Sequence, residues 1–375
     1  MTGASGFIGG RVCERLVQKG ARRVTALVHN PSHGVRIARL PIRICTGDLL
    51  ESESLPGLLG DARIVIHLGL GFGGAIAKGT RNILEASLQA GVDRFIHMST
   101  AAVYGLKPPP QCETEDAPLR RTGNVYCDNK MQAERLVANY CRKGLPVVIL
   151  RPSIVYGPYS RWCSGLIETL THGNGVLIDG GVGICNTTFV DNLVDAIFFS
   201  IEKQEAIGES FFITDGERVT WADFIGSHAA IMKPRPPLGN VSSEEVLSHY
   251  KSQPGLLRSS WIAGRRLVVS REFREMAKQI PLFEGFIQRL WYRFQSLSEE
   301  RKEQLRKRLE GAKSSARAAQ VHKHPIPSLD VCAIQTGEVL FSIDKARRVL
   351  GYQPRVRFSE GMRLTESWLR FANYL

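Results

Sequence analysis

A chain of 375 residues, with 43% hydrophobic and 23% charged residues, is long enough for two or three domain-sized units and excludes wholesale disorder. The net charge is +13, and residues 251–325 carry 17 Lys and Arg against 7 Asp and Glu, which is +10 of that total. The surplus belongs to one segment, so its partner is expected to differ from what the rest of the chain acts on.

Neither a membrane-spanning helix nor a disulfide or metal framework is expected. The longest apolar runs fall far below the length that a bilayer requires. The eight cysteines are scattered without a CxxC pair, which predicts reduced thiols and no metal site. The N-terminus is rich in glycine where a signal peptide would be apolar, so we expect a cytoplasmic protein.

Short β-branched runs alternate with amphipathic stretches in the first 158 residues. Strands are predicted at 24–28, 42–45, 63–68, 94–98 and 146–150, with helical patterns between them. Such alternation implies parallel βαβ units, with helices on both faces of a sheet. The predicted fold is therefore α/β, a doubly wound parallel sheet of the Rossmann type.

After residue 159 the alternation of strand and helix patterns becomes less regular. Glycine-rich turns are followed by a strand and helix and a further strand, a proline-rich break, and regular signals near the C-terminus that end in a helix. These features fall at residues 173–175, 180–183, 189–200, 211–214, 234–237, 339–343, 344–350 and 359–372.

Residues 2–10 read TGASGFIGG and form a GxxGxxG turn that runs into an amphipathic helix. Glycine lets a backbone turn sharply and approach a pyrophosphate, while the start of the helix offers free N–H groups. A dinucleotide-binding unit also needs a strand that leads into this turn, and only Met1 precedes Thr2. We therefore expect the first β-strand to be missing, through a start placed too late.

Tyr126 and Lys130 are four residues apart, which places both side chains on one face of a helix. The stretch MSTAAVYG lies upstream at 98–105, and RPSIVYGP lies downstream at 151–158. Together with the glycine turn, these motifs resemble in order and spacing the extended branch of the short-chain dehydrogenase/reductase superfamily, and within it the NAD-dependent epimerase/dehydratase family. The resemblance covers about residues 2–230 and the last 40.

The resemblance implies an enzyme whose catalytic residues are Thr100, Tyr126 and Lys130. A phenol with a pKa near ~10 is a weak base at neutral pH, so Tyr126 needs a neighbouring cation such as the Lys130 ammonium. Thr100 would position the substrate oxygen. His67, Tyr104 and Cys127 are interpreted instead as packed residues.

The cofactor implied by the resemblance is NAD or NADP. NAD is favoured on family grounds, although Val28-His29-Asn30 lacks the acid that NAD-preferring members place after the second strand. Arg22, Arg23 and His29 are therefore conceivable partners of a 2′-phosphate. Asp48 is either an adenine contact or a helix cap. The implied cofactor contacts are Gly3, Ser5, Gly6, Phe7, Ile8, Gly9, His29, Asp48, Leu49, Leu68, Tyr126, Lys130, Pro152 and Ser153.

Ala101-Ala102 argues against one class of reaction, because the members of the family that dehydrate sugars carry Asp-Glu directly after the catalytic Thr. Dehydration is disfavoured, which leaves hydride transfer at a hydroxyl-bearing carbon by an oxidoreductase or epimerase, with a nucleotide sugar as the leading substrate. Arg161 and Arg218 are candidate substrate cations. The alternatives are a hydroxysteroid-type or other alcohol/ketone dehydrogenase or reductase, and a catalytically silent cofactor-binding protein.

We expect a cofactor domain at 1–158, to which 186–203 returns. A smaller discontinuous substrate domain would comprise 159–185 and 204–375, including a basic helical insert at about 235–330. Within the insert, an aromatic stripe at 283–297 either packs on the substrate domain or a second subunit, or lies on a membrane surface. A homodimer is possible, and no nucleic-acid partner is expected, because no such motif accompanies the charge.

Overall fold

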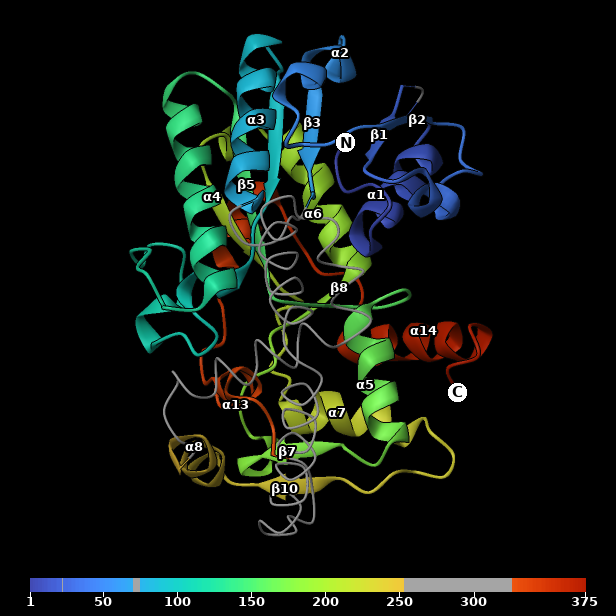
Figure 1. Ribbon diagram of the computed structural model, residues 1–375, viewed down its shortest axis with the longest axis vertical. Helices are drawn as coiled ribbons and strands as arrows, with labels where there is room; N and C mark the ends of the chain where they lie inside the picture. Colours follow the sequence, from blue (N-terminus) through green and yellow to red (C-terminus); the bar gives the residue numbers. More distant parts are fainter. Residues whose placement is uncertain (22, 70–74, 253–325) are drawn as a thin grey trace, which may run out of the picture. The chain divides into compact units, whose positions relative to one another are not determined.

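The computed structural model describes residues 1–21, 23–69, 75–252 and 326–375 (Figure 1). It has two compact units, Met1–Ser243 with Ser328–Leu375 and Glu244–Pro327. The aromatic stripe at 283–297 lies outside the described residues, so the predictions for it stay predictions.

The strands of the first unit pair in parallel, as the alternating pattern predicted. The larger sheet has the order β3-β4-β5-β9, and the pairs β1-β2, β6-β8 and β7-β10 form three smaller parallel sheets. The strands are β1 (Thr25–Val28), β2 (Arg43–Thr46), β3 (Ile64–His67), β4 (Arg94–Met98), β5 (Val147–Pro152), β6 (Ile154–Tyr156), β7 (Val176–Ile178), β8 (Thr187–Phe189), β9 (Ser210–Ile213) and β10 (Gly239–Val241).

The gap between β1 and β3 is filled by the first two residues of the chain. Thr2 forms isolated parallel bridges with Leu27 and His67. Its N–H donates to the Ile66 carbonyl at 3.0 Å, and the Met1 carbonyl accepts from the Leu27 N–H at 2.8 Å. Met1 and Thr2 thus join the two parts of the sheet at this position.

The main helices cover both faces of the larger sheet (Figure 1). Alternate residues of a strand point to opposite faces. Ile96 and Met98 of β4 accordingly pack with apolar residues of α1 and α6, whereas Phe95 packs with those of α3 and α4. The described helices are α1 (Phe7–Gln18), α2 (Leu55–Leu59), α3 (Ala75–Gln89), α4 (Val125–Arg142), α5 (Arg161–Thr171), α6 (Val190–Glu202), α7 (Trp221–Ala230), α8 (Ser243–Ser252), α13 (Leu329–Gln335) and α14 (Phe358–Phe371). This arrangement confirms the doubly wound α/β class.

The C-terminal segment differs from its expected form at one place. Residues 339–343, which we expected to be regular, form no strand in the described structure. The side chain of Asn186 holds them instead, because its Nδ2 donates to the Val339 carbonyl at 2.8 Å and its Oδ1 accepts from the Phe341 N–H at 3.0 Å. A side-chain amide thus takes the place of a neighbouring strand.

Candidate functional site

The glycine turn connects Thr2 to the start of α1 and leaves no room for side chains at two positions. Gly3 has φ +67°, and a Cβ there would lie 2.6 Å from the Leu68 carbonyl. A Cβ on Gly9 would lie 2.1 Å from the Gly3 carbonyl oxygen. Only glycine fits these positions, and the turn forms a cradle at the N-terminus of α1 that suits a pyrophosphate.

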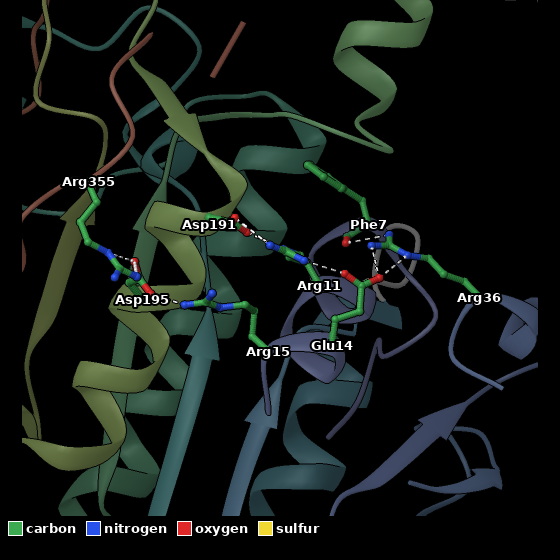
Figure 2. Close-up of polar contacts among 8 residues, drawn as sticks. All are labelled: Phe7, Arg11, Glu14, Arg15, Arg36, Asp191, Asp195 and Arg355. Carbon is green, nitrogen blue, oxygen red and sulfur yellow. Dashed lines mark hydrogen bonds and ion pairs between the residues drawn. The ribbon is translucent and has the colours of Figure 1, made fainter. Parts of the chain in front are cut away.

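Helix α1 is held to α6 by ion pairs (Figure 2). The Arg11 guanidinium donates to Asp191 at 2.8 Å, and Arg15 donates to Asp195 at 3.3 Å. Asp195 also accepts from Arg355 at 2.9 Å. These ion pairs hold α1 against α6.

Arg36, at the end of the turn of 3₁₀ helix after β1, packs against the other side of α1. Its guanidinium donates to Glu14 at 2.9 Å and to the Phe7 carbonyl at 3.3 Å, as Figure 2 shows. The same group lies 3.9 Å from the centre of the Tyr159 ring. These contacts stabilise the first turn of α1.

Two predicted cofactor residues meet at the carboxyl ends of β1 and β2. His29 Nδ1 lies 3.8 Å from Asp48 Oδ2, while Asp48 Oδ1 accepts from the Leu50 N–H at 2.8 Å. Arg23 pairs with Asp61 at an exposed site, and Arg22 is outside the described residues. Asp48 thus binds the backbone two residues further on within a turn, where no helix begins, and its second oxygen faces His29.

The three predicted catalytic residues lie just after the carboxyl end of β4 and in the first turns of α4. The Asn124 side chain caps α4 by accepting from the N–H groups of Tyr126 and Cys127. Thr100 and Tyr126 line the same cavity, and the Thr100 hydroxyl is close enough to lower the pKa of the Tyr126 phenol. Lys130 is buried, and its Nζ donates to the Met98 carbonyl at 2.9 Å.

Burial controls the protonation of this site. It lowers the pKa of Lys130 to about 8, against the opposing effect of the Glu134 carboxylate. Tyr126 is 41% exposed, and the partial burial of its hydroxyl raises the pKa of the phenol, while the neighbouring Thr100 hydroxyl lowers it. At neutral pH Lys130 is therefore mostly charged, and Tyr126 carries its proton.

Behind the catalytic helix lies an ion pair that the sequence did not point out. Arg151 donates through two nitrogens to Glu134 at 2.9 and 2.6 Å and through a third to the Tyr104 hydroxyl at 2.9 Å. The Tyr104 hydroxyl donates to the Glu115 carbonyl at 3.0 Å. Glu134 lies one helical turn after Lys130, and this spacing was the available signal. The network fixes α4 against β5, and Tyr104 lies beneath the site as interpreted.

A cavity of about 390 Å³ opens in front of Thr100 and Tyr126. Arg161 and Arg218, the predicted substrate cations, are exposed and are not among its lining residues. The predicted cofactor residue Ser153 does line it. The described lining residues are Thr100, Ala101, Ala102, Gly105, Leu106, Pro108, Tyr126, Ser153, Ile154, Trp162, Ile184, Asn186, Trp221, Ile334, Gly337, Val339 and Phe341.

The other candidate groups, His67 and Cys127, are buried within the fold. The ring of His67 is buried between the hydroxyls of Thr2 at 2.8 Å and Thr80 at 3.1 Å, and burial lowers its pKa to about 3. Burial raises the pKa of Cys127 to about 11. A neutral imidazole and a protonated thiol agree with the packed roles interpreted from the sequence. No cluster of His, Cys, Asp and Glu within the described ranges could hold a metal ion.

The family model described as the NAD dependent epimerase/dehydratase family matches residues 1–213. The chain belongs to this family. Membership confirms the expected NAD(P)-dependent enzyme of the extended short-chain dehydrogenase/reductase type. None of the helices in the described part is both long and apolar enough to cross a membrane.

Two curated members of the family show how far the similarity extends. A 4-hydroxy-2-methyl-3-oxo-4-farnesyl-3,4-dihydroquinoline-1-oxide ketoreductase of Stigmatella aurantiaca is 27% identical over 252 residues, which are 64% of this chain and 75% of that protein. A UDP-N-acetyl-alpha-D-glucosaminuronate decarboxylase of Bacillus cytotoxicus is 30% identical over 236 residues, or 54% of this chain and 71% of that protein. The relatives of this chain therefore include proteins that act on different substrates.

The solved structures of the family confirm the fold. UDP-glucuronic acid 4-epimerase from Bacillus cereus in complex with NAD matches with a TM-score of 0.66 at 20% identity, covering 99% of this chain and 98% of that one. At this identity the likeness concerns the fold, and the roles of individual site residues depend on the geometry of this chain.

Proposed function

We propose that the chain transfers hydride between NAD(P) and a hydroxyl-bearing carbon of its substrate, as an oxidoreductase or epimerase. The observation that carries this proposal is that Thr100 and Tyr126 line one cavity, with the buried Lys130 one helical turn behind Tyr126 on α4. Ala101-Ala102 offers no further acid or base beside Thr100, so dehydration is not proposed.

The hydroxyl of Tyr126 acts as the general acid or base. In the oxidative direction it takes the substrate hydroxyl proton, and in the reductive direction it returns a proton to the carbonyl oxygen. Thr100 holds that oxygen in line with the phenol. The charged Lys130, whose Nζ donates a hydrogen bond to the Met98 carbonyl, stabilises the phenolate when Tyr126 gives up its proton. Bound NAD(P) would supply the hydride donor or acceptor.

The turn fits a dinucleotide, because Gly3 and Gly9 let its backbone fold closely onto the Leu68 and Gly3 carbonyls at the N-terminus of α1. We assign the pyrophosphate to residues 3–9 and the adenosine end to His29, Asp48 and Leu49. Leu68, Pro152 and Ser153, with Tyr126 and Lys130, would hold the nicotinamide end. NAD remains favoured over NADP.

Two substrate classes use this chemistry. A nucleotide sugar is supported by the Bacillus cytotoxicus decarboxylase and by a UDP-glucose 4-epimerase of Vibrio cholerae, which is 26% identical over 255 residues. Arg161 and Arg218 would then bind phosphate from exposed positions. An alcohol or ketone is supported by the Stigmatella aurantiaca ketoreductase. Homodimer formation and contact with a membrane surface remain further proposals.

The test is Tyr126→Phe, with Tyr159→Phe as the matched control. Tyr159 is exposed and is not among the cavity residues. Hydride transfer, followed by absorbance of the reduced cofactor across nucleotide sugars and ketones, should fall by about 10²–10⁴-fold in Tyr126→Phe. Cofactor binding should survive, because the glycine turn is untouched. Unchanged turnover in Tyr126→Phe would contradict the assignment.

A further inference from the structure

One side of the catalytic cavity is an apolar wall. It consists of Trp162 in α5, Trp221 in α7, Ile334 in α13, and the C-terminal residues Val339 and Phe341. Leu106, Ile154 and Ile184 extend it. The hydroxyls of Thr100 and Tyr126 line the same cavity, so reactive groups and hydrocarbon share one space.

Two polar side chains of the wall bind the protein itself. Asn186 is the one amide side chain among the described lining residues, and both ends of its amide bind the backbone of Val339 and Phe341. The indole N–H of Trp221 donates to the Ile334 carbonyl at 3.0 Å. The Trp221 indole therefore has no donor left for a ligand, and the Asn186 amide keeps one N–H and one lone pair.

The wall is also held in place before any substrate binds. The ring of Phe341 stacks on Phe212 with 4.4 Å between centroids. The ring centroid of Trp221 lies 5.9 Å from that of Phe224 and 6.2 Å from that of Trp162. Rings fixed by such contacts lose little freedom when an apolar group is added against them, which favours binding.

The described lining of the cavity favours one of the two substrate classes. No Lys or Arg is found among the described residues of the cavity, and the hydroxyl-bearing side chains are Thr100, Tyr126 and Ser153. A hexose carries several hydroxyls around its ring, and those facing the apolar wall would lose water without gaining a partner. A hydrocarbon ring or chain loses nothing and buries apolar surface.

We propose that the substrate is a neutral ketone or secondary alcohol whose ring or alkyl body lies against the wall formed by Trp162 and Trp221. This inference rests on the proposed function and names the substrate class of the same site. In reduction, hydride from NAD(P)H forms a C–H bond at the carbonyl carbon, the C=O π bond breaks, and the oxygen takes the Tyr126 proton. NAD(P)⁺ and the alcohol are the products, and water reprotonates the phenolate.

The experiment compares the binding of 2-decalone and UDP-glucose to the full-length protein saturated with cofactor, by calorimetry. We expect 2-decalone to bind at least tenfold more tightly than UDP-glucose. Equal or tighter binding of UDP-glucose, or no binding of 2-decalone, overturns the inference. Loss of cofactor binding itself, or activity that survives Tyr126→Phe, would instead contradict the proposed function.

Trp162→Ala tests the wall directly. Trp162 is 45% exposed, so its loss leaves the core intact, and Trp368→Ala is the matched control, because Trp368 packs on Tyr159 and Tyr374 and is not a cavity residue. The affinity for 2-decalone should fall about tenfold in Trp162→Ala, as expected for the loss of one apolar ring contact. It should not change in Trp368→Ala. Equal effects of the two variants would overturn the inference.

Discussion

The ion pair between Glu134 and Arg151 gives a stringent test of how the catalytic helix is supported. The two side chains are 2% and 6% exposed, and the shortest contact between them is 2.6 Å. Glu134→Gln keeps the shape of the side chain and removes its charge, which leaves the guanidinium buried without a counter-ion. Removing one partner of a buried pair costs about 3–5 kcal/mol, and the retained amide oxygen places our expectation at about 3 kcal/mol in the free energy of unfolding.

The measurement is urea denaturation of wild type and variant, followed by circular dichroism. Glu360→Gln is the control, because Glu360 pairs with Arg363 at 2.7 Å on an exposed face of α14, where such pairs contribute little. We expect no measurable change in that variant. A loss below about 1 kcal/mol for Glu134→Gln would equal the value of an exposed pair and would refute the reasoning.

Three further outcomes are expected. Lys130 has a pKa of about 8 in the folded protein and about 10.4 in the unfolded chain, so unfolding takes up a proton between pH values of about 8 and about 10.4. The free energy of unfolding of wild type, relative to that of Lys130→Met, should therefore rise with pH across this window, as measured by urea titrations. Gly9→Ala should weaken NADH binding at least about tenfold in fluorescence titrations, because the new Cβ meets the Gly3 carbonyl, whereas Gly57→Ala, which has open space, should not. Asp191→Asn removes the charged partner of an arginine on α1 and should make cofactor binding more dependent on salt, because the unpaired guanidinium adds positive charge on the helix that begins at the glycine turn, with kcat at saturating cofactor unchanged; equal salt dependence in wild type and variant would count against this.

Much of the fold follows from local pattern. The runs of β-branched residues predicted β1 to β5 to within two residues at each end, because strand and helix periodicities are visible within short windows. The spacing of Tyr126 and Lys130 placed both on α4 for the same reason. The final helix, predicted at 359–372, is α14 at Phe358–Phe371.

Contacts between distant residues could not be predicted in this way. Asn186 binds a backbone 153 residues further along the chain, and nothing near either segment signals the other. Glu134 and Arg151 are closer in sequence, yet only the packing of α4 on β5 shows that they meet. The apolar lining of the cavity likewise comes from several elements that are separate in the sequence.

The positions of His29 and Asp48 have a consequence for cofactor binding. β1 and β2 pair with each other, and Thr2 bridges β1 to β3. His29 and Asp48, at the adenosine end of the proposed cofactor site, follow these two strands, whereas Tyr126 and Lys130 lie on α4. A dinucleotide held at both ends would therefore tie β1 and β2 to the part of the domain that carries the catalytic residues, and cofactor affinity would include the free energy of keeping these parts together.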